Sequence, residues 1–190
     1  MIQYIEQYNS LIAFVGSVFT IIAALIALYA IVIWRKQQKY SIELNLILYL
    51  EDNYEILITK YIEEFQWFLE LENTIYLEKL KNYQDISEKD MSVFIREEYQ
   101  KKTLADAGSQ YGRKYELVYL RAKRFFPVIE QYEYLKKSFL DEEHSKSIEK
   151  INEQLKKQND PEQIFKEYAE NFLNFKNNGI SILEKLRTKL

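Results

Sequence analysis

The amino-acid sequence predicts an all-α fold, in which one N-terminal transmembrane helix is followed by a cytoplasmic helical-bundle domain of four to six helices. Only four of the 190 residues are glycine and two are proline. Turn-rich β folds need such residues about every 8–12 positions, so this composition argues against them. Two further observations favour helices: a long uncharged segment near the N-terminus, and apolar residues at helical spacing through much of the remaining chain.

The uncharged segment runs from Leu11 to Trp34. As a helix it would measure about 36 Å, which is enough to cross a hydrocarbon core of roughly 30 Å. A secretory signal peptide would have a positively charged start, a shorter apolar run and a small-residue cleavage site. A helix in a soluble core would be interrupted by polar residues. We therefore expect a transmembrane helix over residues 11–34.

Basic residues flank this segment on one side only. Residues 1–10 contain neither Lys nor Arg, whereas Arg35, Lys36 and Lys39 follow the segment directly. Because basic flanks stay on the cytoplasmic side, we expect residues 1–10 to be extracytoplasmic and residues 35–190 to form the cytoplasmic all-α domain. The excess of Lys over Arg is typical of an AT-rich bacterial or mobile-element gene, and we expect the helix to lie in the bacterial inner membrane.

Small side chains gather on one face of the predicted transmembrane helix. At 100° per residue, all eight fall within an arc of about 140°. In lipid, small side chains let helix backbones approach closely, and this contact drives helix association. We therefore expect the chain to form a homo-oligomer through this helix, with a different membrane protein as the alternative partner. The predicted association face consists of Ala13, Gly16, Ser17, Thr20, Ala23, Ala24, Ala27 and Ala30.

The segment that follows is expected to continue as a helix to about residue 81, because residues 17–107 contain neither glycine nor proline. Its apolar residues recur at spacings of three and four, as on one face of an amphipathic helix. A loop is expected at 82–86, and Ser87 is the expected cap of a short helix that ends near residue 104. The apolar stripe consists of Ile47, Leu50, Tyr54, Leu57, Tyr61, Phe65 and Phe68.

The one cluster of chain breakers, residues 106–112, predicts a loop. A helix is expected to begin near Arg113, and Pro127 must kink it or restart it, because proline lacks the N–H that a helix interior requires. The residues expected to be buried are Val118, Ala122, Phe125, Ile129 and Tyr132.

Two further helices are predicted in the C-terminal part of the chain. Asp141 is the expected start of a polar helix with a thin apolar stripe. Asp160 and Pro161 predict a strong helix start, since aspartate caps free N–H groups and proline fits the first turn. Gly179 either lies within this last helix or breaks it in two. The apolar stripes are Ile148, Ile151 and Leu155 in the first helix, and Phe165, Tyr168, Phe172, Phe175, Gly179, Ile182 and Leu186 in the second.

The sequence offers few groups for catalysis. The absence of Cys excludes disulfides and thiolate metal sites, and the single histidine, His144, excludes multi-histidine metal sites. His144 is expected to be exposed in the first turn after Asp141. Phosphate-binding loops and hydrolase motifs are absent, and the paired carboxylates are sequence neighbours that point about 100° apart on a helix. We therefore expect a non-enzymatic protein with no cofactor and no metal.

One segment, residues 108–124, combines tyrosines with five cations against Glu116 alone, although the whole chain has a net charge of −3. Arg side chains beside Tyr rings suit a nucleotide second messenger or a phosphorylated partner. Charge pairing with the acidic helix of residues 40–81 and contact with anionic lipid headgroups are the alternatives. No polybasic tail indicates general nucleic-acid binding. The candidate ligand-binding residues are Arg113, Lys114, Tyr115, Tyr119, Arg121 and Arg124.

The predicted transmembrane helix ends in Trp34-Arg35-Lys36-Gln37-Gln38-Lys39, and an aromatic-rich helix continues through Leu50 and Tyr54. This layout, which covers about residues 15–60, resembles uncharacterised bacterial single-pass membrane proteins, some of them associated with phage-defence loci. The resemblance contains no diagnostic motif and carries over no functional residue. It implies a membrane-acting defence effector or an accessory subunit.

Two hypotheses for the function follow. In the first, the chain is an oligomerising defence or stress effector, or an accessory subunit, whose cytoplasmic helical domain responds to a trigger or partner and acts at the inner membrane. In the second, it is a membrane-anchored sensor or adaptor that binds a nucleotide signal or a phosphorylated partner through the basic–tyrosine segment. The expected partners are the lipid bilayer, further copies of the chain, and a cytoplasmic protein or a nucleotide second messenger.

Overall fold

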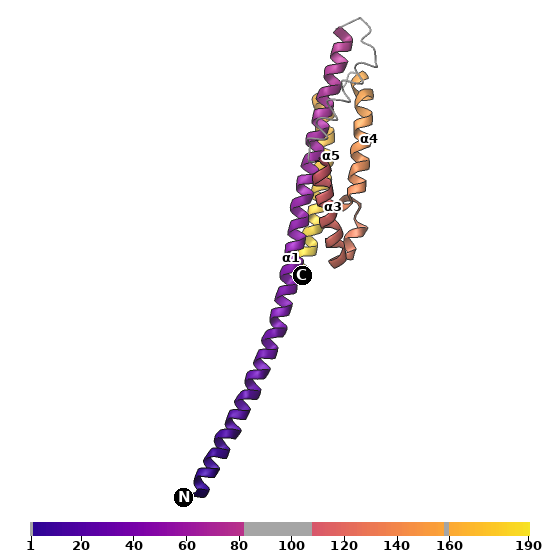
Figure 1. Cartoon of the computed structure of the whole chain (residues 1–190). Coiled ribbons are helices and arrows are strands. Elements are labelled where there is room, and N and C mark those ends of the chain that lie inside the picture. Colours follow the sequence, from indigo (N-terminus) through magenta and orange to yellow (C-terminus); the bar gives the residue numbers. More distant parts are fainter. Residues whose placement is uncertain (1, 82–107, 158–159) are drawn as a thin grey trace. The chain divides into compact units, whose positions relative to one another are not determined.

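The computed structural model describes residues 2–81, 108–157 and 160–190, and among these the side chains of residues 13–76, 110–157 and 160–190. Every regular element in these residues is a helix, which confirms the predicted all-α class. The predicted loop at 82–86 and the helix predicted after Ser87 lie outside the described residues. The elements are α1 (Ile2–Lys81), α3 (Gly108–Phe125), η1 (Pro127–Gln131), η2 (Glu133–Leu135), α4 (Lys137–Lys156) and α5 (Pro161–Arg187), where η denotes a 3₁₀ helix (Figure 1).

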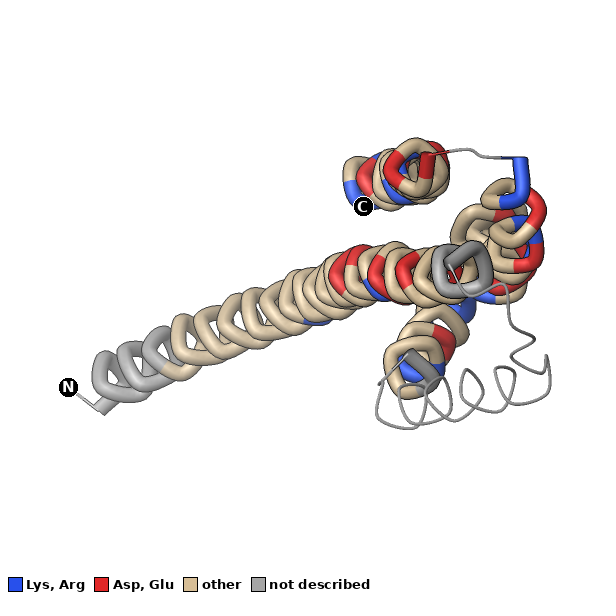
Figure 2. Tube along the Cα trace, turned by 90° about the horizontal axis from the view of Figure 1, so that it is seen from above, with Lys and Arg blue, Asp and Glu red and all other residues tan. Residues whose placement is uncertain are grey.

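The chain divides into two compact units, Met1–Leu44 and Asn45–Leu190, which we call unit 1 and unit 2. Unit 1 is the first part of α1, and its side chains from residue 13 to residue 32 are all exposed. Among the described helices, α1 alone is long and apolar enough to cross a membrane, judged by length and composition. Charged residues are concentrated in unit 2, whereas residues 13–34 of unit 1 are uncharged (Figure 2).

Unit 2 is held together by the predicted apolar stripe on the second part of α1. Six of its seven residues are buried, and Phe68 is partly buried against them. Each of the other α-helices places an aromatic ring on this stripe. The ring centroids are 5.7 Å apart for Tyr54 and Tyr115 of α3, 5.0 Å for Tyr61 and His144 of α4, and 3.7 Å for Phe65 and Tyr168 of α5.

The beginning of α3 differs from the prediction. It lies at Gly108 rather than near Arg113, so the loop predicted to extend to Gly112 is wrong for the last five of its residues. Gly112 is buried, and a Cβ there would approach Lys137 Cε to 2.5 Å. This glycine therefore lies within a helix, beside the flexible Lys137 side chain of α4, and not in a turn.

Pro127 restarts the helix, which was one of the two predicted outcomes. α3 ends at Phe125, and η1 begins at Pro127. Ile129 is buried as predicted, and Tyr132 is partly buried. Phe125 was expected to be buried but is 49% exposed, because the helical periodicity that would have turned it inward ends at this residue.

α4 also begins earlier than predicted, at Lys137 instead of Asp141. Its preceding residue, Lys136, forms no side-chain cap, so the sequence carries no capping signal at this point. α5 begins as predicted, because the Asp160 carboxylate accepts a hydrogen bond from the Glu162 backbone N–H at 3.1 Å. Gly179 lies inside α5, which continues unbroken to Arg187.

Tyr54 joins α1 to two other parts of unit 2. Its hydroxyl lies 2.9 Å from the backbone oxygens of Tyr134 in η2 and Phe175 in α5, which share its one donated proton. Gly179 faces the Tyr54 ring so closely that an added Cβ would overlap it. Burial raises the pKa of the Tyr54 phenol, so the hydroxyl keeps the proton that it donates.

Gly112 and Gly179 of unit 2 provide a matched pair of substitutions. Gly179→Ala should destabilise unit 2 by about 1–3 kcal/mol, because the new methyl group overlaps the fixed Tyr54 ring. Gly112→Ala should be neutral or stabilise by up to about 1 kcal/mol, because Lys137 Cε lies near the end of a flexible side chain and alanine favours the helix. Chemical denaturation of the full chain in detergent measures both effects. Equal effects at the two positions would contradict the close packing at Gly179.

Candidate functional site

The predicted association face lies in unit 1, and all eight of its residues are exposed. Its two hydroxyls donate hydrogen bonds within the helix, from Ser17 to the Ala13 oxygen at 2.8 Å and from Thr20 to the Gly16 oxygen at 2.9 Å. A Cβ at Gly16 would have no neighbouring atom within 4 Å. In the single chain this face is therefore open to a lipid tail or to another helix.

The six candidate ligand residues of α3 do not converge. Tyr115 and Tyr119 point into the core of unit 2, where they are 0% and 9% exposed. The Tyr115 hydroxyl donates to the Leu135 backbone oxygen at 2.6 Å, and burial raises the pKa of both phenols. The four cations Arg113, Lys114, Arg121 and Arg124 are exposed, so the tyrosines and the arginines do not form one site.

Within the described chain, the basic residues of α3 make few contacts of the kind expected if α3 pairs by charge with residues 40–81. Lys114 Nζ lies 5.6 Å from the centroid of the Tyr49 ring, and Lys123 forms an ion pair with Glu130 of η1 at 2.5 Å. Among the described residues, none of the three arginines of α3 forms an ion pair. In this part of the chain α3 therefore contacts α1 through aromatic rings and not through arginine–carboxylate pairs.

Tyr115 and Tyr119 do line a cavity of about 190 Å³, but with lysines instead of arginines. Two of these lysines already have partners: Lys123 pairs with Glu130, and Lys137 pairs with Asp141 at 2.5 Å. An anion would have to compete with both carboxylates. The complete lining is Tyr115, Glu116, Tyr119, Leu120, Lys123, Glu130, Lys136, Lys137 and Ser138.

A second cavity, of about 290 Å³, lies between α1 and α4. His144 lies on its wall and is only 7% exposed, so the expectation of an exposed histidine is wrong. The cause is the earlier start of α4, which places His144 inside the helix, on the side that faces α1. The cavity is lined by Leu57, Lys60, Tyr61 and Glu64 of α1 and by Lys137, Asp141, His144 and Ser145 of α4.

The hydrogen bonds of His144 define its role. Its Nδ1 lies 2.6 Å from the Tyr168 hydroxyl, which donates to the Tyr61 backbone oxygen at 3.3 Å. Nε2 is buried without a hydrogen-bond partner among the described residues, and Glu64 Oε2 lies 3.6 Å away. His144 thus links three helices, α1, α4 and α5.

Sequence spacing could have identified His144 as a core residue. Leu140 and His144 continue the stripe of Ile148, Ile151 and Leu155 at spacings of three and four, which is the pattern of a buried helix face. Leu140, Ile151 and Leu155 are buried, and Ile148 is partly buried. The signal was present, but it required α4 to begin before Asp141.

Three further polar side chains of this cavity, those of Tyr61, Lys137 and Asp141, bind one another. The Tyr61 hydroxyl donates to Asp141 Oδ1 at 2.5 Å, while Lys137 Nζ lies 2.5 Å from Asp141 Oδ2. Burial raises the pKa of the Tyr61 and Tyr168 phenols, which keeps both hydroxyls protonated as donors. These contacts fasten α4 and α5 to α1.

Comparison with protein-family models, curated proteins and solved structures finds no match to this chain.

Alkaline pH is expected to unfold unit 2. Burial raises the pKa of the phenols of Tyr54, Tyr61, Tyr115 and Tyr168 above the ordinary value near 10. The folded state therefore keeps protons that the unfolded state releases. The contribution of these tyrosines to the free energy of unfolding is fully present below about pH 10. Above that pH, the free energy of unfolding falls by about 1.4 kcal/mol per pH unit for each such tyrosine. Denaturation of the full chain in detergent at increasing pH measures the slope.

The variant Tyr168→Phe is the control for this pH dependence. It should be less stable than the parent at neutral pH, because it loses two hydrogen bonds, but its alkaline slope should be smaller by the share of one tyrosine. An unchanged slope would contradict the assignment of Tyr168 as a buried neutral phenol.

Proposed function

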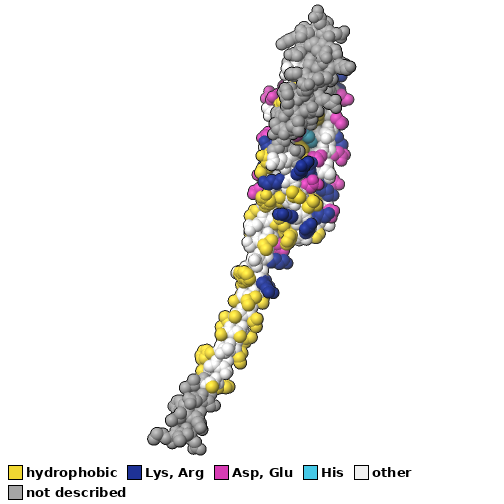
Figure 3. All heavy atoms as spheres, in the orientation of Figure 1, with side chains coloured by type: hydrophobic (Ala, Val, Ile, Leu, Met, Phe, Trp, Pro, Cys, Tyr) yellow, Lys and Arg dark blue, Asp and Glu magenta, His cyan; other side chains and the backbone are white. Residues whose placement is uncertain are grey.

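We propose that this chain is a non-enzymatic, single-pass protein of the bacterial inner membrane. Its N-terminal helix anchors it and associates with other copies, and its helical domain responds to a trigger or partner in the cytoplasm. The observation that carries the proposal is the uncharged, wholly exposed stretch of side chains from residue 13 to residue 32. This stretch is visible as the hydrophobic surface of unit 1 (Figure 3).

Lipid is the solvent that suits this surface. Phe14, Phe19 and Tyr29 are each about two-thirds exposed, at 68%, 67% and 68%. Each large apolar side chain that is left in water forgoes about 1.5–3 kcal/mol, and soluble monomers rarely expose apolar patches of more than a few hundred Å². A helix satisfies its own backbone groups in lipid, and the hydroxyls of Ser17 and Thr20 also find acceptors within α1.

The small face explains how copies would meet. Large side chains occupy the rest of the circumference of this helix, so the closest approach of two backbones is along the face that contains Gly16 and Ala23. The space beside Gly16 is free in the single chain. Association along this face would bring several cytoplasmic domains together, which is the arrangement needed for an effector that acts by assembly.

A binding and assembly role also suits unit 2. Its buried polar side chains Tyr54, Tyr61, His144 and Tyr168 are used to hold the helices together. The sensor hypothesis has less support, because the tyrosines and the arginines of α3 point to different sides. The lysines beside Tyr115 are largely neutralised by Glu130 and Asp141. We therefore expect the trigger to be a partner that contacts the surface of this domain.

Cysteine crosslinking tests the association face, and the chain suits it because it has no native cysteine. In an Ala27→Cys background, disulfide-linked dimers should form in membranes. Adding Gly16→Ile and Ala23→Ile should reduce the dimer-to-monomer ratio at least about tenfold, equivalent to about 1.4 kcal/mol, because the larger side chains keep the backbones apart.

The control carries Val18→Ile and Leu25→Ile, two changes on the opposite side of the same helix, and should crosslink like the parent. Equal crosslinking of both double variants would refute association along the small face and leave the anchoring itself unaffected.

Reporter fusions test the topology. A reporter that is active only outside the cytoplasm should be active when it is fused after residue 10 and inactive when it is fused after residue 190, because Arg35, Lys36 and Lys39 retain their side of the helix in the cytoplasm. A reporter that is active only in the cytoplasm should show the opposite pattern. A cytoplasmic signal at residue 10 would overturn the proposed orientation.

A further inference from the structure

Unit 2 has a surface at one end on which exposed cations and exposed apolar side chains are mixed. On α3 and η1, Phe125 is 49% exposed and Val128 is 36% exposed, beside the exposed Arg121 and Arg124. Exposed lysines at the end of α5 add to this charge. We call this surface the basic–apolar end, and it consists of Arg121, Arg124, Phe125, Val128, Lys185 and Lys189.

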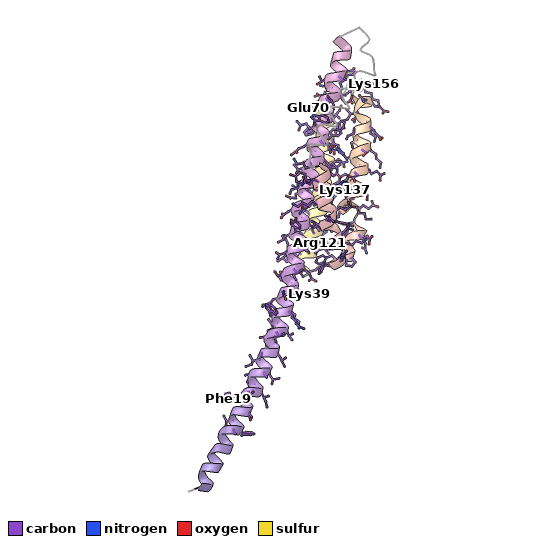
Figure 4. The ribbon with its side chains drawn as sticks, in the orientation of Figure 1. Phe19, Lys39, Glu70, Arg121, Lys137 and Lys156 are labelled. Atoms are coloured by element: carbon purple, nitrogen blue, oxygen red, sulfur yellow. The ribbon has the colours of Figure 1, made fainter. Side chains whose placement is uncertain are left out.

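The α3 part of this surface lies at the Asn45 end of unit 2, where the chain arrives from unit 1. Lys60 lies over the Tyr111 ring, and the Tyr115 ring contacts Tyr54. Later residues of α3 thus meet earlier residues of α1, so the two helices are antiparallel. In Figure 4, Arg121 lies at the opposite end of unit 2 from Glu70 and Lys156.

The end of α5 lies at the same end of unit 2. The Phe65 ring stacks on Tyr168, and Arg187 Nη1 lies 3.7 Å from Glu51 Oε2. α5 is therefore also antiparallel to α1. Two helices consequently bring their basic C-terminal turns to the end of the domain that is connected to the predicted transmembrane helix.

The cations of the basic–apolar end are not used in ion pairs within the described residues. Lys123 and Arg187 nearby are paired, with Glu130 and Glu51 respectively, which removes these two carboxylates as partners. The exposed carboxylate of Glu184 is the acidic group that adjoins Lys185. A net positive, partly apolar surface therefore remains uncovered.

Anionic lipid is the occupant that this surface fits. Arg and Lys side chains bind headgroup phosphates, while exposed aromatic and aliphatic side chains enter the boundary between headgroups and acyl chains. A second copy of this surface would repel it by like charge. None of these residues lines either of the two cavities described above, so a small free anion would find few converging donors.

The length of the chain keeps this surface close to the bilayer. Only residues 35–44 separate the predicted transmembrane helix from unit 2. Even when fully extended, these residues span at most roughly 35 Å. The effective concentration of headgroups around the basic–apolar end is therefore high, and weak contacts suffice for docking.

We propose that the basic–apolar end of unit 2 docks onto anionic phospholipid headgroups of the membrane that holds the N-terminal helix. Arg121, Arg124 and the lysines of α5 contact phosphates, and Phe125 and Val128 enter the interface. Docking fixes how the cytoplasmic domain is presented, and it depends on the lipid composition. This inference rests on the proposed membrane anchoring.

Fluorescence quenching in vesicles tests the docking with the full chain. Three single-cysteine variants carry a fluorophore: Phe125→Cys in the proposed contact, Leu173→Cys at a similarly exposed site of α5, and Leu25→Cys in the predicted transmembrane helix. The vesicles contain nitroxide-bearing lipids and either phosphatidylcholine alone or phosphatidylcholine with phosphatidylglycerol. The label at position 125 should be quenched only with the anionic lipid, the label at 173 in neither mixture, and the label at 25 in both.

Charge variants in the Phe125→Cys background test the arginines. Arg121→Gln with Arg124→Gln should lower the docked-to-free ratio by about fivefold for each arginine, the factor expected for one basic residue at an anionic surface. The matched control, Lys150→Gln with Lys156→Gln, removes the same charge from exposed positions of α4 and should leave the ratio unchanged.

Each outcome decides the proposal. In anionic vesicles, the label at position 25 can be quenched while the label at position 125 is quenched no more than the label at position 173. This result overturns the docking but leaves the anchoring intact, and it favours an acidic protein partner for this surface. Failure of quenching at position 25 overturns both the anchoring and the docking. Equal ratios in the arginine variant and its α4 control would overturn the phosphate contacts, because purified vesicles contain no other partner.

Discussion

The structure of unit 2 depends on the need of buried tyrosine hydroxyls for hydrogen-bond partners. A buried hydroxyl without a partner costs about 1–3 kcal/mol, so each one restricts the packing to arrangements that supply an acceptor. Tyr54 finds its acceptors in η2 and α5, and Tyr115 finds one at Leu135. Tyr61 donates to Asp141 of α4. Hydrophobic burial alone would tolerate a helix sliding along the stripe, whereas these hydrogen bonds define one register.

This use of polar groups separates the parts of the molecule that hold the fold from those that are available to partners. His144 is the residue that a search for catalysis would choose first, yet it is enclosed by Tyr61, Tyr168 and Glu64 and links three helices. Two surfaces of the described residues that have no partner in the single chain are instead apolar or basic: the small face of unit 1 and the basic–apolar end of unit 2. Both would be contact surfaces under the function that we propose.

The extent to which the sequence predicted the elements depended on local signals. Asp160 and Pro161 encode their helix start in two neighbouring residues, and Pro127 cannot remain in a helix interior, so both predictions succeeded. The start of α4 was missed because Lys136 makes no capping hydrogen bond. The start of α3 was missed because glycine is typical of turns, whereas Gly112 lies inside the helix, beside Lys137 of α4.

Charge, hydropathy and periodicity were sufficient for the helical class, the uncharged N-terminal helix and the buried stripe of α1, because each of these properties acts within one helix. The candidate ligand residues of α3 were different: they share one short segment of the sequence, but packing turned the two tyrosines inward and the arginines outward. Contacts between remote parts of the chain, such as Tyr54 with an acceptor 121 residues away, decide which polar groups are buried. Local pattern cannot encode such contacts, because the partner of a buried hydroxyl is known only after the helices have packed.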